Sequence, residues 1–266
     1  MSGIAVWARP AVARVLLAAA VMLATPALRA AEELRFISCP IYRDADAGKK
    51  SGCWLTDNGP SGVRYDISKA PTKPDWNFAV LVEGSVSATQ DNACGGVVMD
   101  PVRVSVLPDA CTRHMIPAEG FPGRRFVLPK RNVRPLSEAR PSPPQPWPDR
   151  VFSLVFDFNR SFAVYQLDDY ILDQAITWIR AVKPRQIIIT GHAATSPAQV
   201  SGHTIAENPD IAAARAEFAA ESMRRLGVDP AILVVRTQLA SEPAAVEGAD
   251  GLLEPSRRRV DIDVRR

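Results

Sequence analysis

The sequence predicts an α+β protein of two domains behind a cleaved export signal, and three features of its 266 residues support this prediction. A stretch crowded with proline, residues 133–149, cannot form a helix or a central strand, because proline fixes φ and lacks an amide donor. All four cysteines lie before that stretch and none follows it. Beyond it, segments with strand and helix periodicity alternate. We therefore assign residues 33–132 to one domain, 133–149 to an extended linker and 150–266 to a second domain.

Residues 1–30 have the features of a secretory signal peptide: Arg9 and Arg14, then the apolar run 15–24, then small residues up to Ala30. That run is shorter than the roughly 20 residues a membrane-spanning helix needs, and no later segment is long enough to span a bilayer as a helix. We expect cleavage near Ala30 and export of the mature protein to an oxidising compartment. Cleavage removes three of the 32 basic residues and none of the 29 acids, so 29 of each remain. This balance gives no support to nucleic-acid binding.

The first domain is expected to be rich in β-structure, because short runs containing β-branched residues are separated by Gly, Pro, Asn and Asp. No window of useful length has helical periodicity. The expected strands are Leu34–Ser38, Cys53–Thr56, Val63–Ile67, Ala79–Val86, Val97–Met99 and Val102–Leu107. A small all-β barrel or sandwich, for example an OB-like one, fits this pattern.

Four cysteines in an exported protein predict two disulfides, for which three connectivities exist. The cysteines are Cys39, Cys53, Cys94 and Cys111. We expect the local pairing, Cys39 with Cys53 and Cys94 with Cys111, because each bond then closes a short loop between neighbouring strands. A metal site is the alternative, but the chain has no Cys-x-x-Cys and only His114 near Cys111 hints at one. We expect no metal and no cofactor.

The second domain alternates strands with helices. One helix has strong end signals: Asn208 as N-cap, Pro209 in the first turn and Gly227 beyond its end. The other expected elements are a strand at Val151–Phe158, a helix at Asp168–Val182, strands at Arg185–Thr190 and Ala231–Arg236, and a final strand around Val260–Val264.

Four segments in this half resemble, in order, the motifs of the OmpA-like, peptidoglycan-associating family. They are Val-Phe-Asp-Phe-Asn at 155–159, Ile-Ile-Thr-Gly-His-Ala-Ala at 188–194, Asn-Pro-Asp-Ile-Ala-Ala-Ala-Arg-Ala at 208–216 and Pro-Ser-Arg-Arg-Arg-Val-Asp-Ile at 255–262. The resemblance covers residues 150–266 and implies a βαβαββ sandwich. With the export signal, it also implies a periplasmic protein that can associate with the outer membrane or cell wall. In the first domain, the segments at 39–44 and 120–129 resemble those of other envelope proteins that join a cysteine-bearing half to an OmpA-like half. No function follows from that resemblance.

The resemblance also implies a site for the peptide stem of peptidoglycan. In the family an arginine holds a carboxylate of the ligand's diaminopimelate and an aspartate holds its ammonium group. Arg215 matches the arginine, and a guanidinium grips a carboxylate through two parallel hydrogen bonds. The alternative interpretation is that Arg215 is a surface residue paired with Glu207 or Asp210. The other matching site residues are Gly191, His192, Asn208 and Arg258.

Ala194 stands at the position of the family's aspartate, and the loop 195–207 is longer than usual. Without the carboxylate, a charge-assisted hydrogen bond of about 1.5–3 kcal/mol is lost. Glu207, Asp210 or Asp250 could supply a substitute. The resemblance therefore implies weak peptidoglycan binding through a degenerate site. The alternative is a periplasmic scaffold or adaptor that has lost this binding and contacts other envelope proteins.

No motif in the chain predicts catalysis. There is no Gly-x-Ser-x-Gly elbow, phosphate-binding loop, His-Glu-x-x-His or dinucleotide fingerprint. Ser201 lies only two residues from His203 in a loop, and His192 is interpreted as a packing residue. We expect a non-enzymatic protein.

Overall fold

The computed structural model describes residues 32–44, 52–59, 61–118, 120–124, 138–163 and 166–266, together with Gly3. The expected signal peptide and its cleavage point lie outside these residues. Within them, no helix combines the length and apolar character needed to cross a membrane.

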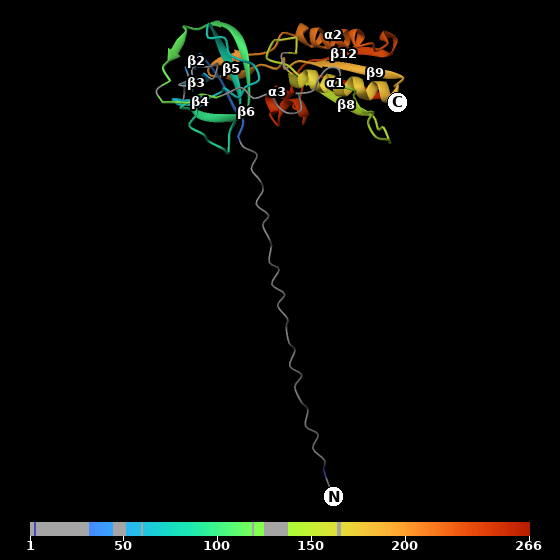
Figure 1. Cartoon of the computed structure of the whole chain (residues 1–266), viewed down its shortest axis with the longest axis horizontal. Coiled ribbons are helices and arrows are strands. Elements are labelled where there is room, and N and C mark those ends of the chain that lie inside the picture. The colour runs from blue at the N-terminus through green and yellow to red at the C-terminus, as the bar shows by residue number, and fades with distance from the viewer. Residues whose placement is uncertain are drawn as a thin grey trace. The chain divides into compact units, whose positions relative to one another are not determined.

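The N-terminal half, residues 32–124, is built on a seven-stranded sheet (Figure 1). The strands are β1 (Leu34–Ser38), β2 (Pro40–Arg43), β3 (Cys53–Asn58), β4 (Val63–Asp66), β5 (Phe78–Val86), β6 (Val97–Ala110) and β7 (His114–Ile116). Their order is β1-β5-β6-β4-β3-β2-β7. The expected strands are confirmed, except that the two predicted at 97–99 and 102–107 are parts of the single strand β6. One core cluster gathers around Phe36, Val82 and Val104, and a smaller one around Ile41 and Leu55.

All four cysteines form disulfides, but the local pairing is wrong. Cys39 is bonded to Cys111, and Cys53 to Cys94. The reason is a pairing between strands far apart in sequence. β2 runs parallel to β7 with Ile41 beside His114, which brings the residues just before the two strands together.

The C-terminal half, residues 150–266, has the predicted element order (Figure 1). The major elements are β8 (Arg150–Val155), α1 (Gln166–Val182), β9 (Gln186–His192), α2 (Asp210–Arg225), β12 (Leu233–Gln238), the short helix α3 (Leu253–Ser256) and β13 (Arg259–Arg265). The strands lie in the order β12-β9-β13-β8, with β12 and β9 parallel and the other neighbours antiparallel. Single 3-10 turns occupy Pro230–Ile232 and Glu247–Ala249.

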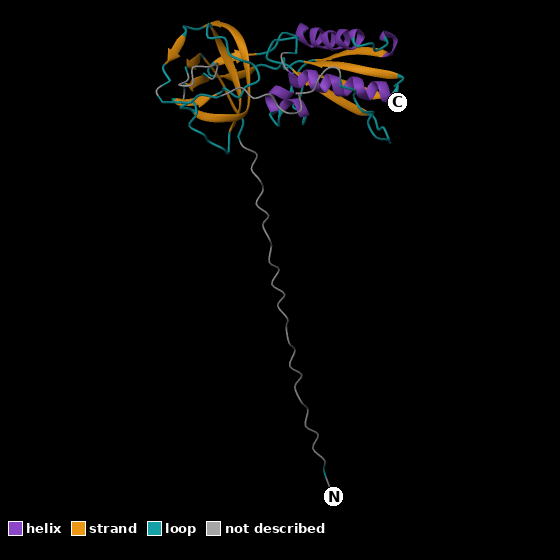
Figure 2. Cartoon of the chain, viewed as in Figure 1, coloured by secondary structure: helices purple, strands orange, loops and turns teal. Residues whose placement is uncertain are grey.

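Both long helices cover one face of this sheet (Figure 2). Ile171, Ile179, Ala216 and Met223 from the helices share a buried cluster with alternate strand residues, among them Ile189 and Ile262. Alternate residues of a strand point to the same face, so the sequence periodicity places these apolar side chains against the helices. The result is a two-layer sandwich of helices on a sheet.

The described part of the proline-rich segment, residues 138–149, contains no helix or strand. It lies against the C-terminal half, where Trp147 packs on the buried cluster and Arg140 Nε donates to Asp173 Oδ2 of α1 over 2.8 Å.

The unusually long loop before α2 forms a hairpin of β10 (Ala198–Val200) and β11 (His203–Ile205). Its Val200 and Ile205 share a cluster with Ala79, Leu81 and Leu107 of the N-terminal half. Ser201 Oγ accepts a hydrogen bond from the backbone amide of Ile37 over 3.0 Å. The inserted residues therefore join the two halves, and Ala31–Arg266 forms one compact unit.

Candidate functional site

Arg215 lies on the first half of α2, as the sequence predicts, but its side chain is completely buried at 0% exposure. Its Nε donates to the carbonyl of Arg160 over 2.8 Å. Nη1 donates to the carbonyl of His192 and to Glu207 Oε2, each over 2.9 Å. Nη2 donates to the carbonyl of Asp157 over 3.1 Å and to Glu207 Oε1 over 2.5 Å. A guanidinium has five N–H donors, so every donor of Arg215 already has an acceptor within the chain.

Glu207 supplies the carboxylate of this arrangement, and its side chain is also fully buried. Burial alone would raise the pKa of Glu207, but the hydrogen bonds and charge of Arg215 outweigh it and hold the pKa below its usual value. Oε1 accepts the amide of Asn159 and Oε2 accepts the amide of Ala194, both over 2.8 Å. The alternative interpretation of the sequence was a surface pair between Arg215 and Glu207 or Asp210. The pair does form, but in the interior.

Ala194, at the family's aspartate position, is 6% exposed. The backbone amide of Ala194 donates to Glu207 and so stabilises the carboxylate of the buried Arg215–Glu207 pair. An aspartate at this position would place a second carboxylate beside that of Glu207.

Gly191 and Asn208 have local structural roles. A Cβ on Gly191 would lie 2.0 Å from the carbonyl oxygen of Ala212, so glycine lets α2 approach β9 closely. Asn208 is exposed, and its Oδ1 accepts the amide of Asp210 over 3.0 Å at the start of α2. The cap residue itself is Pro209, one position later than predicted.

His192 lies at the end of β9 in a chain of polar groups on the sheet face opposite α1 and α2. Its Nδ1 is 3.2 Å from Ser241 Oγ, and its Nε2 is 3.0 Å from Asp261 Oδ2. The order Ser–His–Asp is that of a hydrolytic triad. However, Ser241 is 0% exposed and lies 3.4 Å from Arg259 Nη1, which donates to it. A nucleophile must reach a substrate carbonyl, so this arrangement is a packed polar network.

Arg258 is 1% exposed and joins the two halves. It forms a two-point ion pair with Glu83 of β5, in which Nη1 lies 3.1 Å from Oε1 and Nη2 donates to Oε2. Burial alone would lower the pKa of Arg258, but the charge and hydrogen bonds of Glu83 raise it. Arg35 Nε lies 2.9 Å from Glu83 Oε1, the oxygen that Arg258 Nη1 also contacts. The second motif arginine thus fastens the C-terminal half to the N-terminal half.

Two buried carboxyl groups lie nearby. Burial raises the pKa of Asp157, against the hydrogen bond from Thr72 Oγ1 at 2.5 Å. Burial also raises the pKa of Asp168, to about 7, although Arg103 and the amide of Val155, 3.2 Å away, oppose it. These groups lie at the contact between the halves, where Arg103 also donates to the carbonyl of Gly248.

The structure therefore brings Gly191, His192 and Arg215 together around one buried pair and places Arg258 at a separate one. Glu83 carried no sequence signal, because its partner is 175 residues away. Metal ligands do not gather: the described ranges contain no group of three or more His, Cys, Asp or Glu side chains that could hold an ion.

Part of the chain is similar to several solved structures. It is similar to the OmpA-like domain of FopA1 from Francisella tularensis, at 17% identity over 43% of this chain and 70% of that one, with a TM-score of 0.34. It is similar to the cell wall anchor of the type VI secretion system of Pseudomonas aeruginosa, at 24% identity over 44% and 81%, with a TM-score of 0.33. It is also similar to the periplasmic domain of Helicobacter pylori MotB, at 20% identity over 46% and 86%, with a TM-score of 0.33.

No protein-family model matches the chain, and no curated protein does.

Proposed function

We propose that this protein is a non-enzymatic scaffold of the bacterial cell envelope, in which the OmpA-like half has closed the stem-peptide site of its family. The observation that carries the proposal is the state of Arg215. Its guanidinium is buried, and all five donors are taken by acceptors of the chain itself. The carboxylate of Glu207 makes a two-point contact with Arg215, which is the contact that the family's arginine offers to a carboxylate of the ligand.

A ligand carboxylate would have to displace Glu207, and the cost of doing so is large. Displacement leaves a buried carboxylate without its counter-charge, and breaking a buried ion pair costs about 3–5 kcal/mol. The family's second contact cannot offset this, because Ala194 has no charge to offer the ligand's ammonium group. Even a ligand with an intrinsic Kd of 1 μM, worth about 8 kcal/mol, would retain only millimolar affinity.

Arg258, the other arginine among the predicted site residues, supports the scaffold interpretation. Arg258 and Glu83 form a buried pair between the halves, and the β10–β11 hairpin adds an apolar contact between them. A fixed arrangement of two parts suits a protein that presents surfaces at a set geometry. The export signal expected at residues 1–30 and the two disulfides favour a periplasmic location.

Sedimentation with purified sacculi tests the proposal. The full exported protein should remain in the supernatant, because no donor of Arg215 is available to a stem peptide. Pelleting that free diaminopimelate reverses would contradict it and would restore weak peptidoglycan binding as the better hypothesis.

A further inference from the structure

β8 is the outermost strand of the C-terminal sheet, and its second edge has no neighbouring strand (Figure 1). In an antiparallel pair, the backbone groups of alternate residues point to opposite edges of the strand. The amide of Val155 donates to Asp168 of α1 over 3.2 Å and therefore points away from β13. By this alternation, the backbone groups of Val151 and Ser153 also point to the open edge.

These backbone groups lie beside a cavity of about 260 Å³, between residues 150–153 of β8 and the segment 244–247. Within the described ranges, the amide and carbonyl of Val151 and the amide of Ser153 have no hydrogen-bond partner. The Ser153 carbonyl is approached by Gly248, where a Cβ would lie 3.3 Å from its oxygen. Three backbone groups are thus open, and at about 160 Å³ per residue of extended chain the space holds one to two residues.

The side chains around this cavity form an apolar wall and a neutral polar wall. Phe152 and Ile171 belong to the buried cluster between the sheet and its helices. Arg259 and Asp261 also line the cavity, but they pair with one another over 3.0 Å and so contribute no net charge. The cavity therefore suits an uncharged residue better than an isolated ion.

Opposite charges lie at its two ends. Arg150 begins β8, whereas Glu247 directly precedes Gly248, which lies by Ser153 at the other end; both charged side chains belong to exposed residues. Neither forms an ion pair with any residue that the structure describes. A peptide antiparallel to β8 would begin near Glu247 and end opposite Arg150. Charge complementarity therefore favours a basic residue at its start and an acidic residue at its end.

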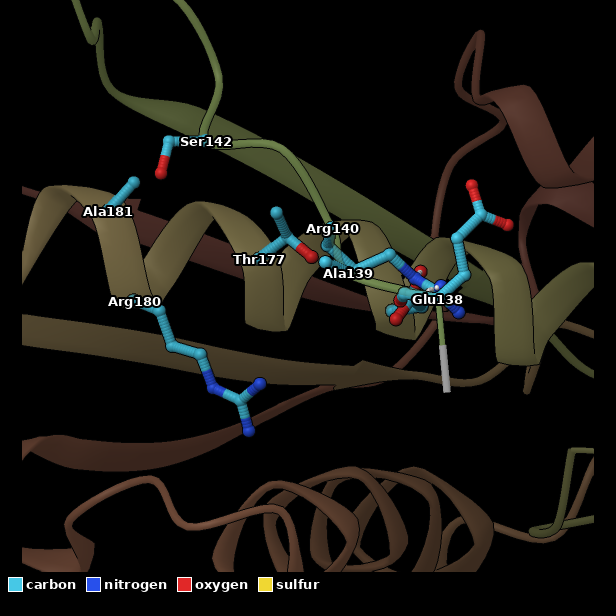
Figure 3. A pocket seen from close by; sticks show the side chains of 8 residues that line it. Glu138, Ala139, Arg140, Ser142, Thr177, Arg180 and Ala181 are labelled. Atoms are coloured by element: carbon cyan, nitrogen blue, oxygen red, sulfur yellow. Dashed lines mark hydrogen bonds and ion pairs between the residues drawn. The ribbon is translucent and has the colours of Figure 1, made fainter. Parts of the chain in front are cut away.

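The larger cavity beside α1, about 400 Å³, is bordered by charged groups that already have partners (Figure 3). Its Arg140 lies 2.8 Å from Asp173, and Nη2 of Arg180 donates to the carbonyl of Leu226 over 3.1 Å. Figure 3 shows Arg180 projecting from α1, whose backbone groups bond within the helix. The open strand edge is the stronger candidate for binding.

We propose that the open edge of β8 binds an extended peptide segment of a partner protein by antiparallel strand addition. Val151 exchanges two hydrogen bonds with one peptide residue, and the amide of Ser153 donates to the carbonyl two residues earlier. The apolar residue between them contacts Phe152 and Ile171. The choice of a protein as partner rests on the proposed scaffold function, whereas the geometry of strand addition does not.

The first test is amide hydrogen exchange of the full exported protein, followed by NMR. The amides of Val151 and Ser153 should exchange rapidly, whereas those of Phe152 and Leu154, which point to β13, should be protected. Protection of Val151 and Ser153 at every protein concentration would show that the edge is covered and would overturn the proposal. Protection that rises with protein concentration would show that a second copy occupies the edge, and would overturn the choice of partner.

The second test is a titration with the probe Ac-Lys-Thr-Val-Thr-Asp-NH2 at physiological salt, where distant charges are screened. The probe should shift the amide resonances of Val151 and Ser153. N-methylation of its second threonine, which removes the donor to the Val151 carbonyl, should weaken binding at least about tenfold. Arg150→Glu should weaken it about fivefold, and a probe with lysine in place of aspartate should recover that loss. Arg185→Glu is the matched control, because this exposed arginine does not line the cavity, and it should change nothing.

The proposal fails if excess probe leaves both resonances unmoved, if the N-methylated probe binds as well, or if Arg150→Glu binds both probes as wild type does. Because this titration is read at β8 and the sacculus assay at Arg215, failure of the proposal is distinguishable from failure of the proposed function.

Discussion

Replacing Arg215 by alanine should destabilise the folded protein severely. The substitution removes the counter-charge of Glu207, whose side chain has no exposed surface. It also leaves the carbonyls of Asp157, Arg160 and His192 without the donors they have now. An arginine whose role is to grip an external ligand would cause neither loss.

The expected magnitude follows from this geometry. Removing one partner of a buried ion pair costs about 3–5 kcal/mol. For a domain of this size each 1 kcal/mol lowers Tm by about 2–4 °C, so Tm should fall by about 10 °C. Replacing both partners, Arg215→Met with Glu207→Leu, should cost less than Arg215→Ala, because no unpaired charge then remains buried.

The assay is thermal and urea unfolding followed by circular dichroism, with the disulfides intact. Arg225→Ala is the matched control, because Arg225 is on the same helix, its side chain is 77% exposed, and it pairs with Glu221 on the surface. That change should cost less than about 1 kcal/mol. If Arg215→Ala unfolds within 2 °C or so of wild type, the guanidinium is not the buried structural group described above.

Three further predictions concern other parts of the structure. Non-reducing peptide mapping should join Cys39 to Cys111, and removing that bond should cost about 4 kcal/mol in urea unfolding; a peptide joining Cys39 to Cys53 would contradict the strand pairing. Asp168→Asn should stabilise the protein above pH 7, by up to about 4 kcal/mol, and change it little at pH 4, which unfolding at both pH values measures. The sign follows because the pKa of Asp168 is raised to about 7, so its stabilising protonated form is fully present below pH 4 and is lost as pH rises through 7; an equal effect at both pH values would exclude this cause. Gly191→Ala should cost about 3 kcal/mol, because the added Cβ meets the backbone of Ala212, and a fully stable variant would show that α2 can move away from β9.

Local signals predicted the C-terminal elements well. Asn208, Pro209 and Gly227 marked the ends of α2, and the alternation from Val260 to Val264 marked β13. One shift has a local cause: the strand predicted at Ala231–Arg236 is β12, Leu233–Gln238, because Pro230–Ile232 forms a 3-10 turn whose first amide donates to Asp229 Oδ1 over 2.9 Å.

The remaining features depend on contacts between distant segments. The disulfide pairing follows from β2 lying parallel to β7, which no local pattern marks. The motif placed Arg215 correctly on α2, but its burial depends on the loop that carries Glu207, on two carbonyls of the β8–α1 connection and on the last carbonyl of β9. The sequence could therefore identify Arg215 and Glu207 as partners, whereas only the fold shows that the pair is buried.

The most direct measurement of the central claim is the side-chain NMR spectrum of Arg215. Its Nε–H and Nη–H resonances, assigned with the double variant Arg215→Met with Glu207→Leu, should be sharp, slow to exchange with water and unmoved by excess diaminopimelate. Rapid exchange with solvent, together with a diaminopimelate-dependent shift of the Nε–H resonance, would show an open ligand site and contradict the account.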